Sequence, residues 1–301
     1  MQIALQLGGH VIHLREPHDY PCLAWPIRPF DRFLAESDTR PDFEIDVEVC
    51  ATLPELKKGP IRFDAAHGYW TVFESESGLV IESLSPQLLQ PRARAHISAD
   101  YRTVQAWVLP DFHMGQVGWS PMHLFNPIVE VCLLSRLALD GGLVLHAAGV
   151  SFQEQGYVFT GASGTGKSTI AQLFADQGAL ILSDERVILR RQGACVTVYG
   201  TPWVGSGQYA AQASQSVTSL YGIGHGEHRH RLEPLSPTKT ISLLLQQAFL
   251  PHWDRVAMEA TLDFLASLTT HVPCFGLAFL KQTDVIDLLQ TRPASVATGI
   301  A

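Results

Sequence analysis

Eight consecutive residues carry the clearest chemical signal in this chain: Gly161-Ala162-Ser163-Gly164-Thr165-Gly166-Lys167-Ser168. They match the phosphate-binding pattern of Gly, four residues, Gly, Lys and Ser or Thr. The glycines let backbone N–H groups point at phosphates, and the following helix, which takes in Thr169, adds its positive end. Lys167 would reach the outer phosphates, while the Ser168 hydroxyl would contact Mg²⁺. The pattern predicts binding of a nucleoside triphosphate.

The neighbouring residues fit the elements that must position this loop. Residues 156–160 form an apolar, β-favouring run just before it. Residues 168–177 carry Ile170, Leu173 and Phe174 at helical spacing, and the run stops at Gly178. Strand, loop and helix therefore occur in the required order. A plain glycine-rich turn is the alternative, but it leaves the Lys-Ser pair at the start of the helix unexplained.

A pair of acids follows the next apolar run. Residues 180–183 are apolar except for the last, and they end in Asp184-Glu185, which resembles the magnesium-holding acids of phosphate-loop ATPases. Asp184 follows Lys167 by 17 residues, which leaves room for one helix and the very next strand. Those ATPases usually bring the acid from much further along the chain, so the spacing indicates a different nucleotide-binding architecture. A solvated turn at a strand end is the alternative.

Composition limits the classes of function. With 301 residues, of which 46% are apolar, the chain can form one large domain or two ordinary ones. The net charge of −8, from 29 acidic and 21 basic residues, argues against a nucleic-acid-binding surface. The N-terminus lacks a secretion signal and no apolar run reaches membrane-spanning length. The cysteines are scattered and favour reduced thiols, so we expect a soluble, cytoplasmic protein; they are Cys22, Cys50, Cys132, Cys195 and Cys274.

Residues 1–118 differ from the rest and predict an N-terminal, antiparallel β-rich domain. Short segments that alternate polar and apolar residues are separated by Pro and Gly clusters. These predicted strands are 42–49, 68–73, 78–83, 95–97 and 104–109. Residues 127–139 then read as a helix that has Pro127 in its first turn and ends at Gly141-Gly142.

Residues 119–301 predict an α/β domain with α+β character and a mixed β-sheet. Helices are expected after the phosphate loop and over 254–270. The expected strands are 143–146, 157–160, 179–182, 187–189, 196–199, 241–245 and 275–280. Residues 222–231 contain three histidines; we interpret them as a mobile, solvated loop, with a metal site as the alternative.

Three spacings make the chain resemble the HPr serine kinase/phosphorylase family and, more widely, the fold shared with phosphoenolpyruvate carboxykinase. That family combines a His-containing strand, a phosphate loop 15 residues after the His, and an acidic pair 17 residues after the loop lysine. Here His146 precedes Gly161 by 15 residues. Residues 199–205 also resemble HPr-kinase-related proteins without the regulatory domain, including kinases that tailor precursor peptides.

The resemblance covers residues 140–290 and has departures. Thr169 replaces the family's Glu, Glu185 replaces the second Asp, and the segment that binds HPr in the true enzymes is missing. HPr itself is therefore not the expected acceptor. Residues 1–118 match nothing in the HPr enzymes, and we interpret them as an acceptor-selecting domain.

The residues present supply each role that phosphoryl transfer needs. The loop and Lys167 would hold ATP, Ser168 and Glu185 would hold Mg²⁺, and Asp184 would be the general base. The resemblance implies that His146 orients Asp184 or the metal shell; a core histidine is the alternative. Tyr199, Thr201 and Trp203 are candidates for a pocket wall and equally for core residues.

The sequence therefore predicts a magnesium- and ATP-dependent kinase that acts on a Ser hydroxyl of a peptide or small protein. Two alternatives stay open, namely a small-molecule kinase on the same fold and a non-catalytic nucleotide-sensing module. The expected partners are the acceptor and, in a homo-oligomer, further copies of the chain. Neither nucleic acid nor a membrane is expected.

Overall fold

The computed structural model describes residues 2–15, 17, 19–23, 27–36, 38–65, 69–84, 90–113 and 115–291. The chain is a mixed α/β structure and divides into two compact units. Residues 1–136 and 251–258 form the first unit, and residues 137–250 and 259–301 form the second. The sequence placed the boundary at 118/119. Long-range bonds explain the difference: Tyr101 donates to Asp254 at 2.6 Å and Trp253 donates to Ser135 at 2.9 Å, which ties both later segments to the first unit.

The first unit is built on an eight-stranded sheet in the order β1-β2-β3-β8-β7-β6-β5-β4. The antiparallel prediction is wrong at two pairings, because β3 runs parallel to both β2 and β8. Strand direction depends on the route of the connecting segments, which local alternation does not encode. The strands are β1 (Gln2–Leu7), β2 (His10–Arg15), β3 (Phe43–Val49), β4 (Ile61–Asp64), β5 (Trp70–Ser75), β6 (Gly78–Leu84), β7 (Pro91–Ser98) and β8 (Thr103–Val108).

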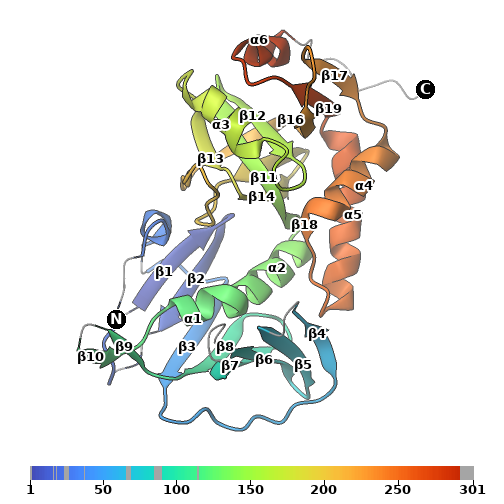
Figure 1. The fold of residues 1–301 in the computed structure, drawn as a ribbon. Helices are drawn as coiled ribbons and strands as arrows, with labels where there is room; N and C mark the ends of the chain where they lie inside the picture. Colours follow the sequence, from blue (N-terminus) through green and yellow to red (C-terminus); the bar gives the residue numbers. More distant parts are fainter. Residues whose placement is uncertain are drawn as a thin grey trace. The chain divides into compact units, whose positions relative to one another are not determined.

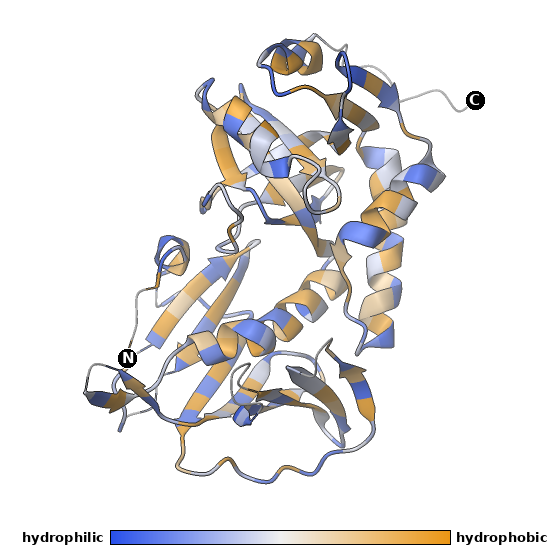
Figure 2. Ribbon diagram, viewed as in Figure 1, coloured by the Kyte–Doolittle hydropathy of each residue, from blue (hydrophilic) through white to orange (hydrophobic). Residues whose placement is uncertain are grey.

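Alternation along these strands creates one buried face, as the colouring of Figure 2 shows. On β3, Phe43, Ile45 and Val47 are buried, whereas the acidic residues between them are not. The predicted strand 68–73 appears as β5, although Gly68 lies outside the described residues. A small hairpin of β9 (Asp111–His113) and β10 (Gln116–Gly118) follows β8.

A helical segment lies across the sheet of the first unit (Figure 1). It consists of α1 (Met122–Leu124), a π-helical stretch (Phe125–Val129) and α2 (Glu130–Leu139), and a short 3-10 helix (Phe30–Phe33) lies elsewhere in this unit. Within the described residues, 122–139 is the one helical stretch that is long and apolar enough to span a membrane, and 67% of it is buried in the protein. Core packing therefore accounts for its apolar character.

The second unit holds a nine-stranded mixed sheet. Its main order is β12-β11-β14-β15-β16-β19-β17, with β13 and β18 also paired to β11 and with β12 also paired to β16. Most pairs are antiparallel, but β12–β16 and β16–β19 are parallel, which confirms the predicted mixed sheet. The strands are β11 (Gly142–Phe152), β12 (Gln155–Thr160), β13 (Leu180–Ser183), β14 (Arg186–Gln192), β15 (Cys195–Tyr199), β16 (Ser214–His225), β17 (Arg231–Pro234), β18 (Ala248–Phe249) and β19 (Cys274–Phe279).

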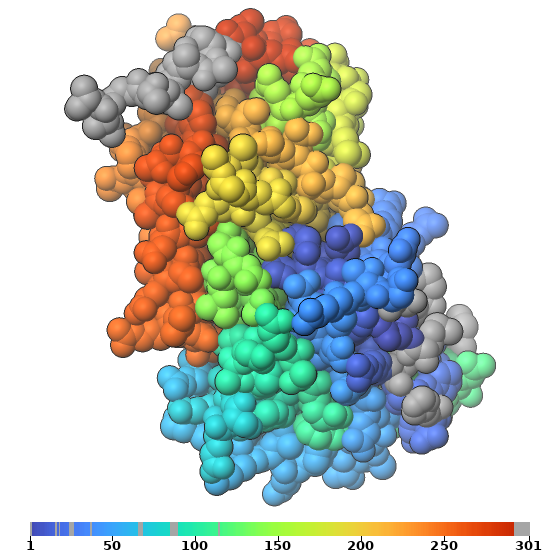
Figure 3. Space-filling model, turned by 180° about the vertical axis from the view of Figure 1, so that it is seen from behind, coloured from blue at the N-terminus to red at the C-terminus, as the bar shows by residue number. Residues whose placement is uncertain are grey.

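Helices cover both faces of this sheet. Successive residues of β12 enter opposite cores: Phe159 joins the one that contains α3 (Lys167–Ala175) and α6 (Asp284–Gln290). Val158 joins the one that contains α4 (Pro237–Gln247) and α5 (Arg255–His271). The outer side of α5, where Leu262 is exposed, forms part of the surface seen in Figure 3. The phosphate-loop helix is therefore on one face of the sheet only.

Two local predictions in this unit are wrong. Residues 241–245, expected as a strand, lie inside α4, which Ser236 caps by accepting from the Lys239 N–H and which begins at Pro237. Its apolar Leu run packs one residue, Leu244, fully into the core, which is helical rather than strand spacing. Residues 222–231, expected as a loop, are largely the end of β16 and the start of β17.

Candidate functional site

The phosphate loop has the conformation that its glycines predict. It joins β12 to α3, and Gly164 and Gly166 have φ angles of +83° and +104°, which L side chains rarely adopt. A Cβ on Gly166 would also lie 3.0 Å from Phe279 Cζ. The Thr165 hydroxyl donates to the Ala162 carbonyl at 2.8 Å and closes the turn. The loop therefore depends on glycine both for backbone angle and for space.

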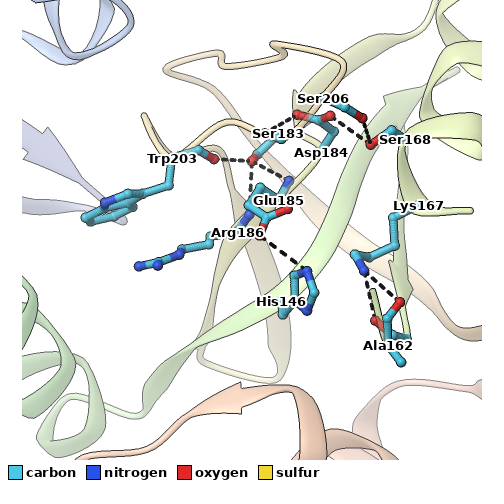
Figure 4. A network of polar contacts seen from close by, with 12 residues as sticks. His146, Ala162, Lys167, Ser168, Ser183, Asp184, Glu185, Arg186, Trp203 and Ser206 are labelled. Atoms are coloured by element: carbon cyan, nitrogen blue, oxygen red, sulfur yellow. Dashed lines mark hydrogen bonds and ion pairs between the residues drawn. The ribbon is translucent and has the colours of Figure 1, made fainter. Parts of the chain in front are cut away.

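Lys167 is held against the loop that it follows. Its ammonium donates to the carbonyls of Gly161 and Ala162 at 2.9 and 3.1 Å (Figure 4). The residue is only 6% exposed, and this burial lowers the pKa of its ammonium below the ordinary value, although the Glu185 carboxylate opposes the shift. The loop carbonyls thus hold a single positive charge at the edge of the pocket.

A cavity of about 350 Å³ lies between the loop and the acidic pair, which is within the usual size range of small-molecule sites. It brings together residues from β11, the phosphate loop, α3 and the β13–β14 turn. All three predicted catalytic residues and both predicted metal ligands line it. The lining residues are His146, Ser163, Gly164, Gly166, Lys167, Ser168, Thr169, Asp184, Glu185 and Ser206.

Asp184 is fully buried, and three donors bind its carboxylate. Ser168 Oγ donates to Oδ2 at 3.0 Å, the Gly205 N–H donates to Oδ1 at 2.9 Å, and the Gly207 N–H donates to Oδ2 at 2.7 Å. A buried carboxylate keeps its charge when donors surround it in this way. Both oxygens of Asp184 are engaged, one of them by the predicted magnesium ligand Ser168.

Glu185 is in a different environment from its neighbour. Its side chain is 40% exposed, and Oε1 lies 3.4 Å from Nε2 of His146. The pairing of β11 with β14 sets this contact, because His146 is opposite Arg186 in the register. Burial, and then the positive charge of Lys167, lower the pKa of His146 below 6.5, so its ring is neutral near pH 7. Glu185 therefore faces the pocket beside a neutral imidazole.

A strap, which we define as residues 203–209, crosses the acidic pair and was not predicted as part of the site. The Ser183 hydroxyl donates to the Trp203 carbonyl at 3.2 Å, and the Tyr209 hydroxyl donates to Gln172 on α3 at 2.6 Å. The Gly205-Ser206-Gly207 sequence was the available signal, because two glycines around one residue are typical of a close backbone approach. Only the fold shows which group the backbone approaches.

The three residues proposed for a pocket wall do not line this cavity. Thr201 is fully buried and donates to the Arg186 carbonyl at 2.6 Å, and Tyr199 accepts from Gln192 at 2.5 Å. Trp203 points away from Lys167 and Ser168 in Figure 4, and its ring lies 5.5 Å from the Arg186 guanidinium. Their contacts are those of core and strand-packing residues.

The three histidines of residues 222–231 do not meet at one point. His225 contacts the Gly164 carbonyl at 2.9 Å, whereas His230 is paired with Asp284 at 3.0 Å. Across the described part of the chain, no group of three or more His, Cys, Asp or Glu side chains is arranged to hold a metal ion. Transition-metal chemistry built on such clusters therefore has no support at these residues.

The donor set at the phosphate loop nevertheless fits Mg²⁺. This cation prefers oxygen ligands and usually takes one or two carboxylates together with substrate phosphates. Ser168 and Asp184 supply a hydroxyl and a carboxylate in direct contact with one another at the edge of the cavity. Such a pair is a partial site that a nucleotide would complete.

Comparisons with known proteins give one structural likeness. The chain is similar to the structure of the Hpr(Ser) kinase/phosphatase from Coxiella burnetii, with 14% sequence identity and a TM-score of 0.30. The match covers 49% of this chain and 93% of that one. No protein-family model and no curated protein matches the chain. A likeness at this TM-score carries no weight in the argument that follows, which rests on the residues of the pocket.

Proposed function

We propose that this chain is a magnesium- and ATP-dependent kinase of the HPr-kinase-related type that phosphorylates a Ser hydroxyl of a peptide or small protein. The observation that carries the proposal is the convergence of Lys167, Ser168, Asp184, Glu185 and His146 on one cavity. These residues come from separate elements, and a nucleotide-binding loop alone would not need them together. Phosphoryl transfer needs this combination of phosphate-binding groups, metal ligands and a base.

The contacts favour exchanging the roles that the sequence predicted for the two acids. Asp184 is fully buried, and both of its oxygens accept hydrogen bonds, one of them from Ser168. Ser168 and Asp184 would therefore hold Mg²⁺, which would neutralise phosphate charge when bound. Glu185 has an exposed carboxylate and is the better-placed general base. We assign the proton of the acceptor hydroxyl to Glu185.

His146 acts in this proposal through Glu185 rather than on the substrate. Its ring contacts the Glu185 carboxylate on one side, and the Gln247 side chain hydrogen-bonds to it as well. The neutral ring fixes the direction of the carboxylate and leaves it able to accept a proton. Lys167 would leave the loop carbonyls for the outer phosphates of ATP, which are stronger acceptors.

Two further parts of the proposal concern the rest of the chain. The first unit is the proposed acceptor-selecting part, because every residue of the phosphate site belongs to the second unit. A cytoplasmic location is supported by the five cysteines, all of which are free thiols in the structure. ATP and Mg²⁺ are also available in that compartment.

The test is transfer of labelled terminal phosphate from ATP. The chain would be incubated with magnesium, labelled ATP, and the peptides and metabolites encoded or made beside its gene. We expect label on a peptide Ser with wild-type protein, and none with Glu185→Gln, which keeps the size of the side chain but cannot accept the proton. Label on a metabolite would support the small-molecule kinase instead. Binding of magnesium-ATP without turnover to any acceptor or to water would contradict a kinase and support a nucleotide-sensing module.

A further inference from the structure

Ser206 is an exposed residue of the strap that lines the nucleotide cavity. Its hydroxyl donates to Ser168 Oγ at 3.1 Å (Figure 4). Nothing in the sequence pattern of the phosphate loop accounts for this contact, since the two serines are 38 residues apart. The contact places a third oxygen beside the proposed magnesium ligands.

The strap holds Ser206 in this position by its two neighbours. The N–H groups of Gly205 and Gly207 donate to the two carboxylate oxygens of Asp184 at 2.9 and 2.7 Å. A Cβ on Gly205 would lie 2.9 Å from Asp184 Oδ2, and one on Gly207 would lie 2.8 Å from the same oxygen. Larger residues would push the strap away, so the glycines keep Ser206 next to the carboxylate.

The direction of the hydroxyl protons carries the inference. Ser206 donates to Ser168, and Ser168 donates to Asp184, so each serine oxygen keeps lone pairs for other partners. A cation bound by Ser168 would use the lone pair that now receives the Ser206 proton. The Ser168 proton can stay on Asp184, but the Ser206 hydroxyl must rotate, and its own lone pairs then face the same point.

We propose that Ser206 is a third oxygen donor of the magnesium site, alongside Ser168 and Asp184, acting on the cation directly or through one of its waters. The inference rests on the proposed function, because the nucleotide phosphates complete the site. Hard cations favour hydroxyl and carboxylate oxygens. The strap is thereby coupled to metal binding, since its residue 206 contacts the cation while residues 205 and 207 hold the aspartate.

The experiment uses two variants of equal shape, Ser206→Thr and Ser206→Val, which differ only in a hydroxyl and a methyl group. The affinity of Mn²⁺ for the full chain would be measured by electron paramagnetic resonance with a non-hydrolysable ATP analogue present. We expect Ser206→Thr to match wild type and Ser206→Val to bind Mn²⁺ roughly tenfold more weakly, the usual effect of losing a group around a metal. Affinity for the analogue without metal should be equal in both variants.

A second readout reports the strap itself. Hydrogen exchange of residues 203–209 should slow when Mn²⁺ and the analogue bind to wild type and Ser206→Thr, and should slow less in Ser206→Val. Equal or tighter Mn²⁺ binding by Ser206→Val would overturn the inference, because the hydroxyl would then only fill the empty site. Wild-type protein that binds no Mn²⁺ with nucleotide would overturn the kinase proposal together with this inference, so the two failures are distinguishable.

Discussion

The substitution Asp184→Asn tests the central contact of the site. The amide of Asn replaces one accepting oxygen by an NH₂ group, whereas all three partners of Asp184 donate. If the amide replaces Oδ1, it meets the Gly205 N–H; if it replaces Oδ2, it meets the Gly207 N–H. In the better orientation, one charge-assisted bond is lost and one buried donor is left without an acceptor.

The size of the effect follows from these contacts. A hydrogen bond to a charged group contributes about 1.5–3 kcal/mol, and a buried donor without an acceptor costs about 1–3 kcal/mol. Relief from burying a charge offsets part of this. We expect the free energy of unfolding to fall by roughly 2–4 kcal/mol in urea titrations monitored by tryptophan fluorescence. The exposed Asp263→Asn is the matched control and should change stability by less than about 0.5 kcal/mol.

The same variant distinguishes the two roles proposed for Asp184. As a metal ligand, its loss should weaken magnesium-ATP binding by roughly tenfold or more, and excess Mg²⁺ should partly restore it. As a general base, its loss should leave binding within a few-fold and slow transfer by about a hundredfold. Unchanged stability, binding and transfer in Asp184→Asn would refute the assignment of the acidic pair to the site.

Three further predictions follow from single contacts. Lys167→Met should lower ATP affinity by roughly ten- to a hundredfold in calorimetry, because one charge-assisted hydrogen bond is lost, and equal affinity would remove the nucleotide assignment. The NMR titration midpoint of His146 should lie below pH 6.5; Lys167→Met should raise this pKa and Glu185→Gln should lower it further, and shifts of opposite sign would show that these charges do not act on the ring. Gly207→Ala should destabilise the protein by about 1–3 kcal/mol, because its Cβ would lie 2.8 Å from a buried carboxylate oxygen, whereas Gly224→Ala, with open space around it, is the control; equal melting temperatures would contradict this.

Local sequence patterns were sufficient where one short segment makes the structure. Strand, glycine loop and helix over residues 156–175 follow from consecutive residues, because glycine angles and helix spacing act within a few residues. The alternating strands of the first unit were likewise predictable. The Leu-rich residues 241–245 were not, because a short apolar run fits a strand or a helix until its caps are considered.

Only the tertiary structure decided what the acids and the strap do. The sequence placed Asp184 and Glu185 side by side, yet their different burial depends on the strap, which folds back over Asp184 alone. His146 meets Glu185 because of the register between β11 and β14, and no local pattern encodes that register. The chemistry available in the chain is thus a property of its sequence, whereas the division of roles depends on distances between segments that the folded sheet brings together.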